Sequence, residues 1–282
     1  MLVNYQKMHG KLFLQKLHKW DKIKVKESDP LGGIGMFTLK GRTCVFAGAT
    51  GMVGRGAVRA LVEAGMNVVM VTHNPDSAKE VVAAMEGKPG RCLAMSNDKD
   101  DSLIYQAVEE MFGSVDVIIS NTGSFNSPRK FEEITEEEMT KKVSFHVAGP
   151  MTMVQKALPF LERSKAPRVL LMASAGAQDG FAGENICDSV ARGAVISLTY
   201  CLAKELAGRG ITVNCIAKSA MVNDHPPHGP QDLDTATLES RVPLGRIGTN
   251  DEFGAAVAYL ASEEAGFVTG QVLNLSGGLH IG

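Results

Sequence analysis

The sequence has few cysteines, little net charge and no long apolar run, and each shortage argues against a class of protein. Its five cysteines are scattered, odd in number and never in a CxxC pair (Cys44, Cys92, Cys187, Cys201 and Cys215). This argues against a disulfide framework and against a zinc site, and we expect no metal. With a formal net charge of -2, no global attraction to nucleic acid or to an anionic membrane is expected.

Targeting and membrane signals are also lacking. The basic N-terminal residues have no continuous apolar run and no small-residue cleavage site, so they do not resemble a signal peptide. No stretch is expected to reach the length of a membrane span. Together with the unpaired cysteines, this predicts a cytoplasmic protein.

The chain has 282 residues, of which 44% are hydrophobic and 21% charged, and this is enough for one large core. We predict a basic, amphipathic extension over residues 1–36 and a single domain over residues 37–282. In the extension, Phe13, Leu14, Leu17 and Trp20 fall at helical spacing among lysines, which predicts a short amphipathic helix. The extension either packs on its own domain or a neighbouring subunit, or binds a membrane surface or another partner.

The domain alternates short β-branched or apolar runs with helical segments. Strands separated by helices must pair in parallel through crossover connections, so the pattern predicts an α/β fold. We expect a Rossmann-type doubly wound parallel sheet of about seven strands with helices on both faces, and ligands beyond the carboxyl ends of the strands. The expected strands are residues 43–47, 67–72, 91–95, 116–120, 168–172, 211–216 and 271–275.

A glycine-rich turn follows the first of these strands in "CVFAGATGMVGRGAVRALVEAG", residues 44–65. Glycines without side chains let the backbone turn tightly and approach a pyrophosphate, and the N-terminus of the following helix stabilises its charge. The alternative is a turn with a purely structural role. The predicted cofactor-binding residues of this turn are Gly48, Thr50, Gly51, Met52, Val53 and Gly54.

The end of the second strand bears on the choice of cofactor. Thr72, followed by His73, stands where an acidic residue would bind the ribose hydroxyls of NAD. Without that carboxylate, a 2'-phosphate is not repelled, so NADP(H) is slightly favoured over NAD(H). Ser96 and Asn97, at the end of the third strand, are counted among the cofactor-binding residues.

Several segments of the domain resemble the short-chain dehydrogenase/reductase family. They are "DVIISNTG" (116–123), "LAKELAGRGITVNCIA" (202–217) and the long C-terminal segment over residues 242–278. The resemblance implies an NAD(P)-dependent oxidoreductase acting on a small carbonyl or alcohol substrate. It also implies a homotetramer or homodimer with helices near 101–113 and 187–206 at the subunit contacts. Asn121 and Gly123 match the family turn that supports the adenosine side of the cofactor, whereas Ser120 and Thr122 depart from it. Asn121, Thr122 and Gly123 are all counted among the cofactor-binding residues.

The family's catalytic positions are changed in this chain. Ser174 matches the serine after the fifth strand, but the Tyr-x-x-x-Lys at Tyr200 lies too far along the chain to share a site with it. Matching "RGAVISLT" (192–199) to the family instead places Asp188 at the tyrosine and Arg192 at the lysine. His146 stands at the family's catalytic asparagine.

These residues suggest a rebuilt proton relay. Ser174 and His146 are expected to flank the reacting oxygen, with Asp188 orienting or charging His146 and Arg192 contacting the nicotinamide ribose. The four-residue spacing of Asp188 and Arg192 also predicts an ion pair on one helix face. Purely structural roles stay open as alternatives: His146 as a buried, hydrogen-bonded histidine, and Asp188 with Arg192 as an ion pair on the helix surface.

Three functions are compatible with the sequence. The first is an NAD(P)-dependent oxidoreductase with an altered relay, because hydride transfer requires only that cofactor and substrate are held in register. The second is a cofactor-binding pseudoenzyme that senses or scaffolds, and the third is a non-redox lyase or isomerase on the same fold. His225 and His228, in a proline-rich segment without an acidic or cysteine partner, are expected to have a loop role rather than to bind metal.

Overall fold

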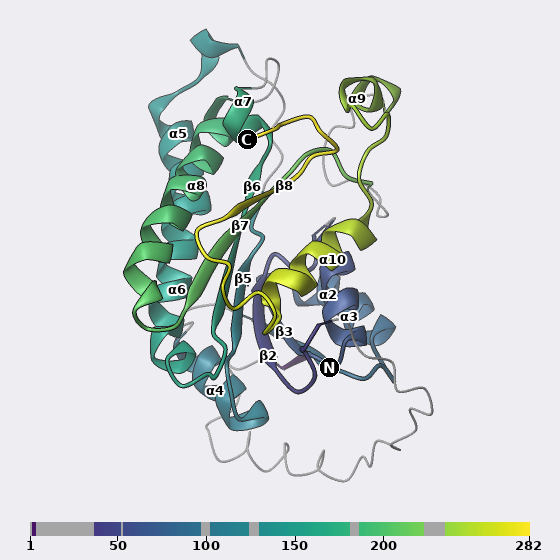
Figure 1. Ribbon diagram of the computed structural model, residues 1–282, viewed down its shortest axis with the longest axis vertical. Coiled ribbons are helices and arrows are strands. Elements are labelled where there is room, and N and C mark those ends of the chain that lie inside the picture. The colour runs from purple at the N-terminus through teal and green to yellow at the C-terminus, as the bar shows by residue number, and fades with distance from the viewer. Residues whose placement is uncertain are drawn as a thin grey trace.

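The computed structural model describes residues 2–3, 37–51, 53–96, 102–123, 130–180, 186–222 and 235–282. One parallel sheet lies between two layers of helices, as Figure 1 shows. This arrangement confirms the predicted α/β fold class.

The sheet contains eight strands in the order β1-β4-β3-β2-β5-β6-β7-β8, and every neighbouring pair is parallel. The chain builds outward from β2 in one direction and from β5 in the other, which confirms the doubly wound topology. The seven longer strands lie close to the predicted segments. They are β2 (Thr43–Ala47), β3 (Asn67–Thr72), β4 (Cys92–Ser96), β5 (Val117–Ser120), β6 (Arg168–Ser174), β7 (Thr212–Lys218) and β8 (Val272–Leu275).

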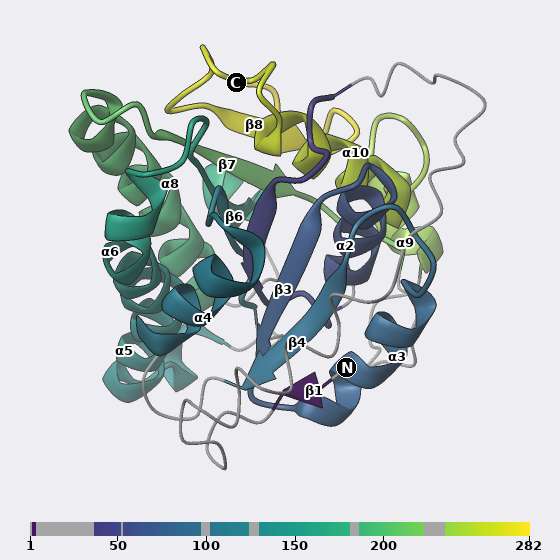
Figure 2. The ribbon, with the colours of Figure 1, turned by 90° about the horizontal axis from the view of Figure 1, so that it is seen from below.

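The helices divide between the two faces of the sheet (Figure 2). One face carries α2 (Gly54–Glu63), α3 (Pro75–Ala84) and α10 (Asn250–Ala261). The other carries α4 (Ser102–Phe112), α6 (Gly149–Leu161) and α8 (Ile186–Ala207). The shorter helical segments are η2 (Phe131–Glu133), α5 (Glu136–Val143), η3 (Ser144–Ala148), α7 (Gly176–Asp179) and α9 (Thr235–Arg241).

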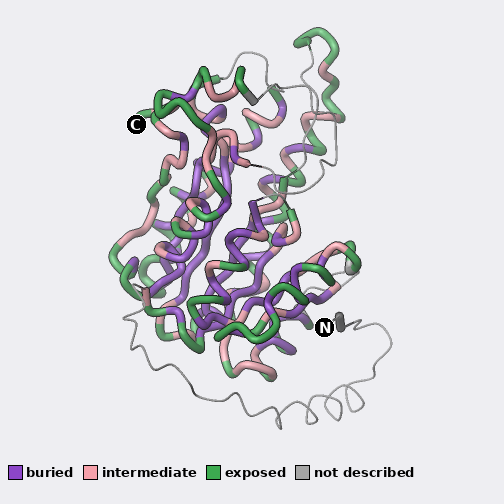
Figure 3. The backbone as a smooth tube through the Cα atoms, turned by 90° about the vertical axis from the view of Figure 1, so that its right-hand side faces the viewer, coloured by how far each residue is buried: buried purple, intermediate pink, exposed green. Residues whose placement is uncertain are grey.

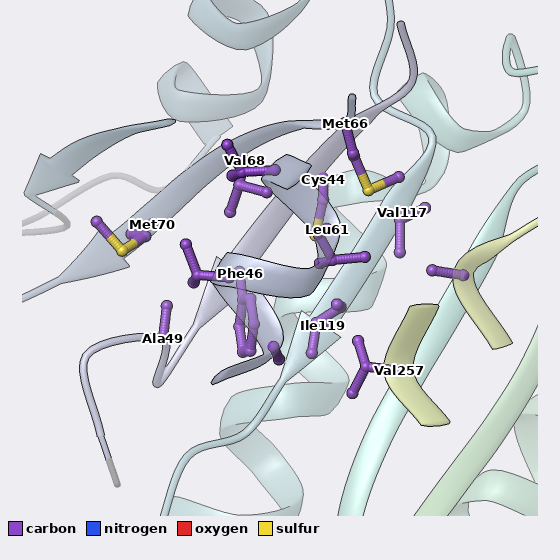
Figure 4. Packing of buried hydrophobic residues seen from close by; sticks show 14 of the residues in the cluster. Cys44, Phe46, Ala49, Leu61, Met66, Val68, Met70, Val117, Ile119 and Val257 are labelled. Atoms are coloured by element: carbon purple, nitrogen blue, oxygen red, sulfur yellow. The ribbon is translucent and has the colours of Figure 1, made fainter. Parts of the chain in front are cut away.

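Two hydrophobic cores result, one on each face. Alternate residues of a strand point to opposite faces, so Phe46 belongs to the core under α2 and α10 whereas its neighbour Val45 belongs to the core under α8. In the first core, Phe46 packs with Leu61 of α2 and Val257 of α10 (Figure 4). Because both faces are covered, the central strands are buried throughout and read as continuous apolar runs (Figure 3).

The crossover from β5 to β6 ends in a helix with a π-helical turn in its middle. Thr135 caps α5 by accepting a hydrogen bond from the backbone N–H of Glu138 at 3.2 Å. Glutamates in the first turn and lysines in the last complement the helix dipole. The π-helical turn η3 then places His146 toward the interior, where its side chain is 1% exposed.

The first residues of the chain add to the edge of the sheet. Strand β1 (Leu2–Val3) pairs in parallel with β4, so the start of the predicted extension contacts the domain itself. The predicted amphipathic helix at Phe13 to Trp20 lies outside the described residues. The boundary between residues 36 and 37 stays a prediction.

One described helix corrects the expectation that no stretch reaches the length of a membrane span. By length and composition alone, α8 is long and apolar enough to cross a membrane. It packs on β6 and β7, however, and buries Ala191, Val195 and Ala203 among other residues. One side of α8 therefore belongs to the core of the domain, whereas Val190 and Tyr200 on the same helix are exposed.

Candidate functional site

The glycine turn after β2 leaves no room for side chains at two positions. Gly48 has a φ of 77°, and a Cβ there would lie 2.3 Å from the carbonyl oxygen of Asn121. A Cβ on Gly54 would lie 2.5 Å from the carbonyl oxygen of Gly48. Only glycine fits at either position. Gly51 differs, because its Cβ would meet only the Gly48 oxygen, at 3.5 Å, and the residue is exposed.

A second turn, after β5, is tied to the first. The side chain of Asn121 donates a hydrogen bond from Nδ2 to the carbonyl of Gly48 at 3.1 Å, and its backbone N–H donates to Ala47 at 2.9 Å. The hydroxyls of Ser120 and Thr122 lie 3.5 Å apart. The structure therefore brings the predicted residues of both turns together where the sheet order switches.

These turns fit the phosphates of a dinucleotide. Helix α2 begins at Gly54 without a side-chain cap at Val53 and without an acidic residue in its first turn. Its N-terminal backbone donors and the positive end of its dipole thus favour an anion beside Gly51. Met52 lies outside the described residues.

The expected adenosine side lies at the ends of β3 and β4. Thr72 and Ser96 are register partners, and the Thr72 hydroxyl exchanges hydrogen bonds with the backbone of Asn74. His73 is exposed. Asn74 caps α3 by accepting hydrogen bonds from the first-turn backbone, and Asn97 lies outside the described residues.

A cation that the sequence reasoning missed stands beside the glycine turn. Arg55 donates from Nε to the carbonyl of Thr50 at 3.2 Å, and its Nη1 lies 3.3 Å from a carboxylate oxygen of Glu80. Its signal in the sequence was its place in the first turn of α2, directly after Gly54.

Arg192 reaches from α8 toward the turn after β5. Its Nη1 donates to the carbonyl of Met172 at 3.4 Å, and a Cβ built on Gly123 would lie 2.9 Å from its Nη2. The guanidinium therefore stands between the ends of β5 and β6, on the side of the predicted cofactor turn.

Asp188 accepts two hydrogen bonds at the start of α8. Lys142 Nζ lies 2.9 Å and His146 Nε2 3.2 Å from the same oxygen, Oδ1. Burial of Asp188 raises its pKa, but hydrogen bonds from His146 and Lys142, with the charges of Lys142 and Arg192, together lower it below its ordinary value. Asp188 is thus held as a carboxylate.

This arrangement differs from the expected one in two respects. The side chain of His146 is 1% exposed and that of Asp188 17%, so His146 lies behind Asp188 rather than open to a substrate. Asp188 also binds Lys142 and His146, whereas Arg192 contacts Met172 and acts on Asp188 through its charge. The sequence reasoning missed Lys142, although its position four residues before His146 puts both on one helix face.

Ser174 ends β6, where it is half-buried and in register with Lys218 of β7. The backbone N–H of the next residue donates to the Lys218 carbonyl at 2.9 Å. Tyr200 is 46% exposed, far along α8, in agreement with its exclusion from the site. His225 and His228 lie outside the described residues.

Known proteins resemble this chain over nearly all of the domain. A family model described as enoyl-(acyl carrier protein) reductase matches residues 48–280. The 3-oxoacyl-[acyl-carrier-protein] reductase FabG of Staphylococcus epidermidis is 30% identical over 246 residues, covering 85% of this chain and 99% of that protein. Its namesake from Thermotoga maritima is 28% identical over 247 residues, covering 86% and 99%. A short-chain type dehydrogenase/reductase from Mycobacterium ulcerans has a similar structure, with a TM-score of 0.78 at 24% identity, covering 86% of this chain and 90% of that chain.

Proposed function

Because this chain belongs to the short-chain dehydrogenase/reductase family and is an oxidoreductase of that type, we propose that it transfers a hydride between NADP(H) and a carbonyl or secondary alcohol through an altered proton relay. The observation that carries the proposal is the position of the glycine turn. Its open helix N-terminus is joined through Asn121 to the turn after β5, and that turn contacts Arg192. A phosphate site and a charged group on α8 thus adjoin one another.

When bound, the nicotinamide supplies or accepts the hydride. The protein's part is to hold both reactants in register and to move the proton. Gly48, Gly51 and Gly54 let the backbone approach the phosphates, while Arg192 contacts the ribose in place of the family's lysine. Ser174 donates a hydrogen bond to the substrate oxygen.

The proton passes between the substrate oxygen and His146 through Asp188. Lys142 and His146 both hydrogen-bond to Oδ1 of Asp188. The other carboxylate oxygen, Oδ2, would then contact the substrate. Asp188 alone is a poor proton donor, because its pKa is lowered. His146, which is hydrogen-bonded to Oδ1, supplies or stores the proton behind it.

The preference for NADP(H) follows from the end of β3. Thr72 places no carboxylate there, and Arg55 stands at the neighbouring turn. A 2'-phosphate would therefore meet no carboxylate at residue 72, and Arg55, whose guanidinium also contacts Glu80, would supply a cation nearby.

The relatives' names suggest a 3-oxoacyl thioester as one substrate to test. We further propose a cytoplasmic homodimer or homotetramer with contacts through α4 and α8. On α8, Val190 and Tyr200 are large exposed apolar or aromatic side chains that such a contact would cover.

The test is a fluorescence titration of the protein with NADPH and with NADH, followed by a panel of ketones and 3-oxoacyl thioesters while the absorbance of the reduced cofactor is recorded. We expect tighter binding of NADPH and substrate-dependent oxidation. Arg192→Ala should weaken binding at least tenfold, whereas Arg209→Ala, at an exposed arginine just beyond α8, should leave it within twofold. Failure to bind either cofactor would refute the proposal.

A second candidate is a cofactor-binding sensor without turnover. It is favoured by one observation: a carboxylate held in its charged form occupies the position where the family has its proton-donating tyrosine. Tight binding of NADPH with no turnover across the whole panel would support this candidate.

A further inference from the structure

Lys142 is a buried lysine that no motif of the sequence explains. It is 5% exposed, although lysine is almost never fully buried unless it is paired. Its neighbour Lys141, on the same helix, is exposed. Burying an ammonium group is unfavourable unless a counter-charge is in contact. The Lys142 ammonium meets this condition through Asp188, at 2.9 Å.

The contact joins two elements that are distant in sequence. Lys142 is in the last turn of α5, and Asp188 is in the first turn of α8, 46 residues later. His146, one turn beyond Lys142, approaches the same carboxylate oxygen at 3.2 Å. Two donors on one oxygen fix the orientation of the carboxylate and leave its second oxygen for another partner.

We propose that Lys142 is a positioning residue, which keeps Asp188 ionised and oriented so that Oδ2 of Asp188 accepts a proton from a substrate hydroxyl. In alcohol oxidation, the O–H bond breaks and its proton goes to Oδ2. The carbon's hydride goes to the oxidised nicotinamide cofactor, and a C=O bond forms. The proposal rests on the proposed function.

The charges around Asp188 set the expected pH dependence. Lys142 and Glu138 face this region from α5, His146 faces it from η3, and Arg192 lies one turn away on α8. Asp179, on α7, is hydrogen-bonded to His280. Without Lys142, one hydrogen bond and the nearest positive charge are lost while burial still disfavours the carboxylate.

The first experiment compares Lys142→Met with Lys142→Arg and with Lys141→Met as the matched control. We expect Lys142→Met to move the acid limb of the kcat/KM profile for alcohol oxidation upward by at least one pH unit, and so to lower kcat/KM at least tenfold at a pH on that limb. Cofactor affinity should stay within twofold. The arginine variant should keep the wild-type profile within half a unit, and Lys141→Met should be unchanged. A wild-type profile in folded Lys142→Met would overturn the proposal.

A second experiment needs neither cofactor nor activity. The urea midpoint of unfolding is measured for Lys142→Met, Asp188→Asn and the double variant. If the two side chains form one unit, the double variant should be more stable than Lys142→Met alone, because no unpaired carboxylate is buried. Additive losses would overturn the proposal. The two readouts separate the ideas: no turnover by the wild type would refute the proposed function and the role of Asp188 with it, whereas turnover without coupling would refute only the role of Lys142.

Discussion

The glycine turn provides a test that separates folding from cofactor binding. Alanine at Gly48 would adopt a left-handed backbone conformation, with a φ of 77°, which costs about 1–2 kcal/mol. Its Cβ would also lie 2.3 Å from the carbonyl oxygen of Asn121. The displaced turn would lose the hydrogen bond from Asn121, worth about 1 kcal/mol. We therefore expect Gly48→Ala to lower the free energy of unfolding by about 2–3 kcal/mol.

Alanine at Gly51 should weaken cofactor binding while leaving stability nearly unchanged. Its Cβ would have ordinary contacts, at 3.5 Å, so the free energy of unfolding should change by less than about 0.5 kcal/mol. The methyl group would, however, stand between the backbone and the phosphates. We expect the Kd for NADPH to rise at least about tenfold, or roughly 1.4 kcal/mol. Gly208→Ala is the matched control, because a Cβ there meets nothing within 4 Å and the residue follows the far end of α8.

Urea unfolding without cofactor and fluorescence titration with NADPH measure the two effects separately. Wild-type affinity in Gly51→Ala would refute the placement of the phosphates against this turn. Wild-type stability in Gly48→Ala would refute the argument from crowding.

Two further changes probe the cofactor region, and a third probes the cap of α10. Asn121→Ala should lower the free energy of unfolding by about 1 kcal/mol in urea titrations, because its hydrogen bond to Gly48 is lost. Thr72→Asp should reduce the ratio of NADPH to NADH affinity at least about tenfold in fluorescence titrations, because its carboxylate would repel a 2'-phosphate. Hydrogen bonds from Arg246 and the adjacent backbone lower the pKa of Glu252 to about 2; this stabilisation is present above the unfolded pKa, near 4.5, and is lost as the pH falls toward 2. Glu252→Gln should therefore be less stable than wild type in urea at pH 6 and match it near pH 2.

The fold could be predicted because its strands carry a local signal. Strands such as β2 and β6 are buried on both faces, so they appear in the sequence as continuous apolar runs between breakers. The turn after β2 was also recognisable, since its glycines fall at fixed spacing. The sequence did not distinguish Gly48, which is crowded by backbone, from Gly51, which is not. That distinction depends on Asn121, in the turn after β5 and far along the chain.

The candidate catalytic region was predicted less completely, because its contacts are long-range. The spacing of Asp188 and Arg192 predicted a pair on one helix, since helical neighbours can be identified from sequence alone. The hydrogen-bond partners of Asp188 lie on α5 and η3, 46 and 42 residues earlier in the chain. Lys142 therefore looked like one more lysine in an ordinary helix terminus.

The pairing of Lys142 with Asp188 bears on whether this site performs chemistry. A protein that only bound a cofactor would need no charges at this place, because well-packed apolar side chains are often as stable as a buried ion pair or more so. A buried pair also leaves a costly unpaired charge whenever either partner is lost. The structure nevertheless holds a lysine, a histidine and a carboxylate in contact, with the carboxylate nearest to solvent. Such an arrangement supports the proposed proton relay, in which Asp188 lies between His146 and the more exposed side of the site.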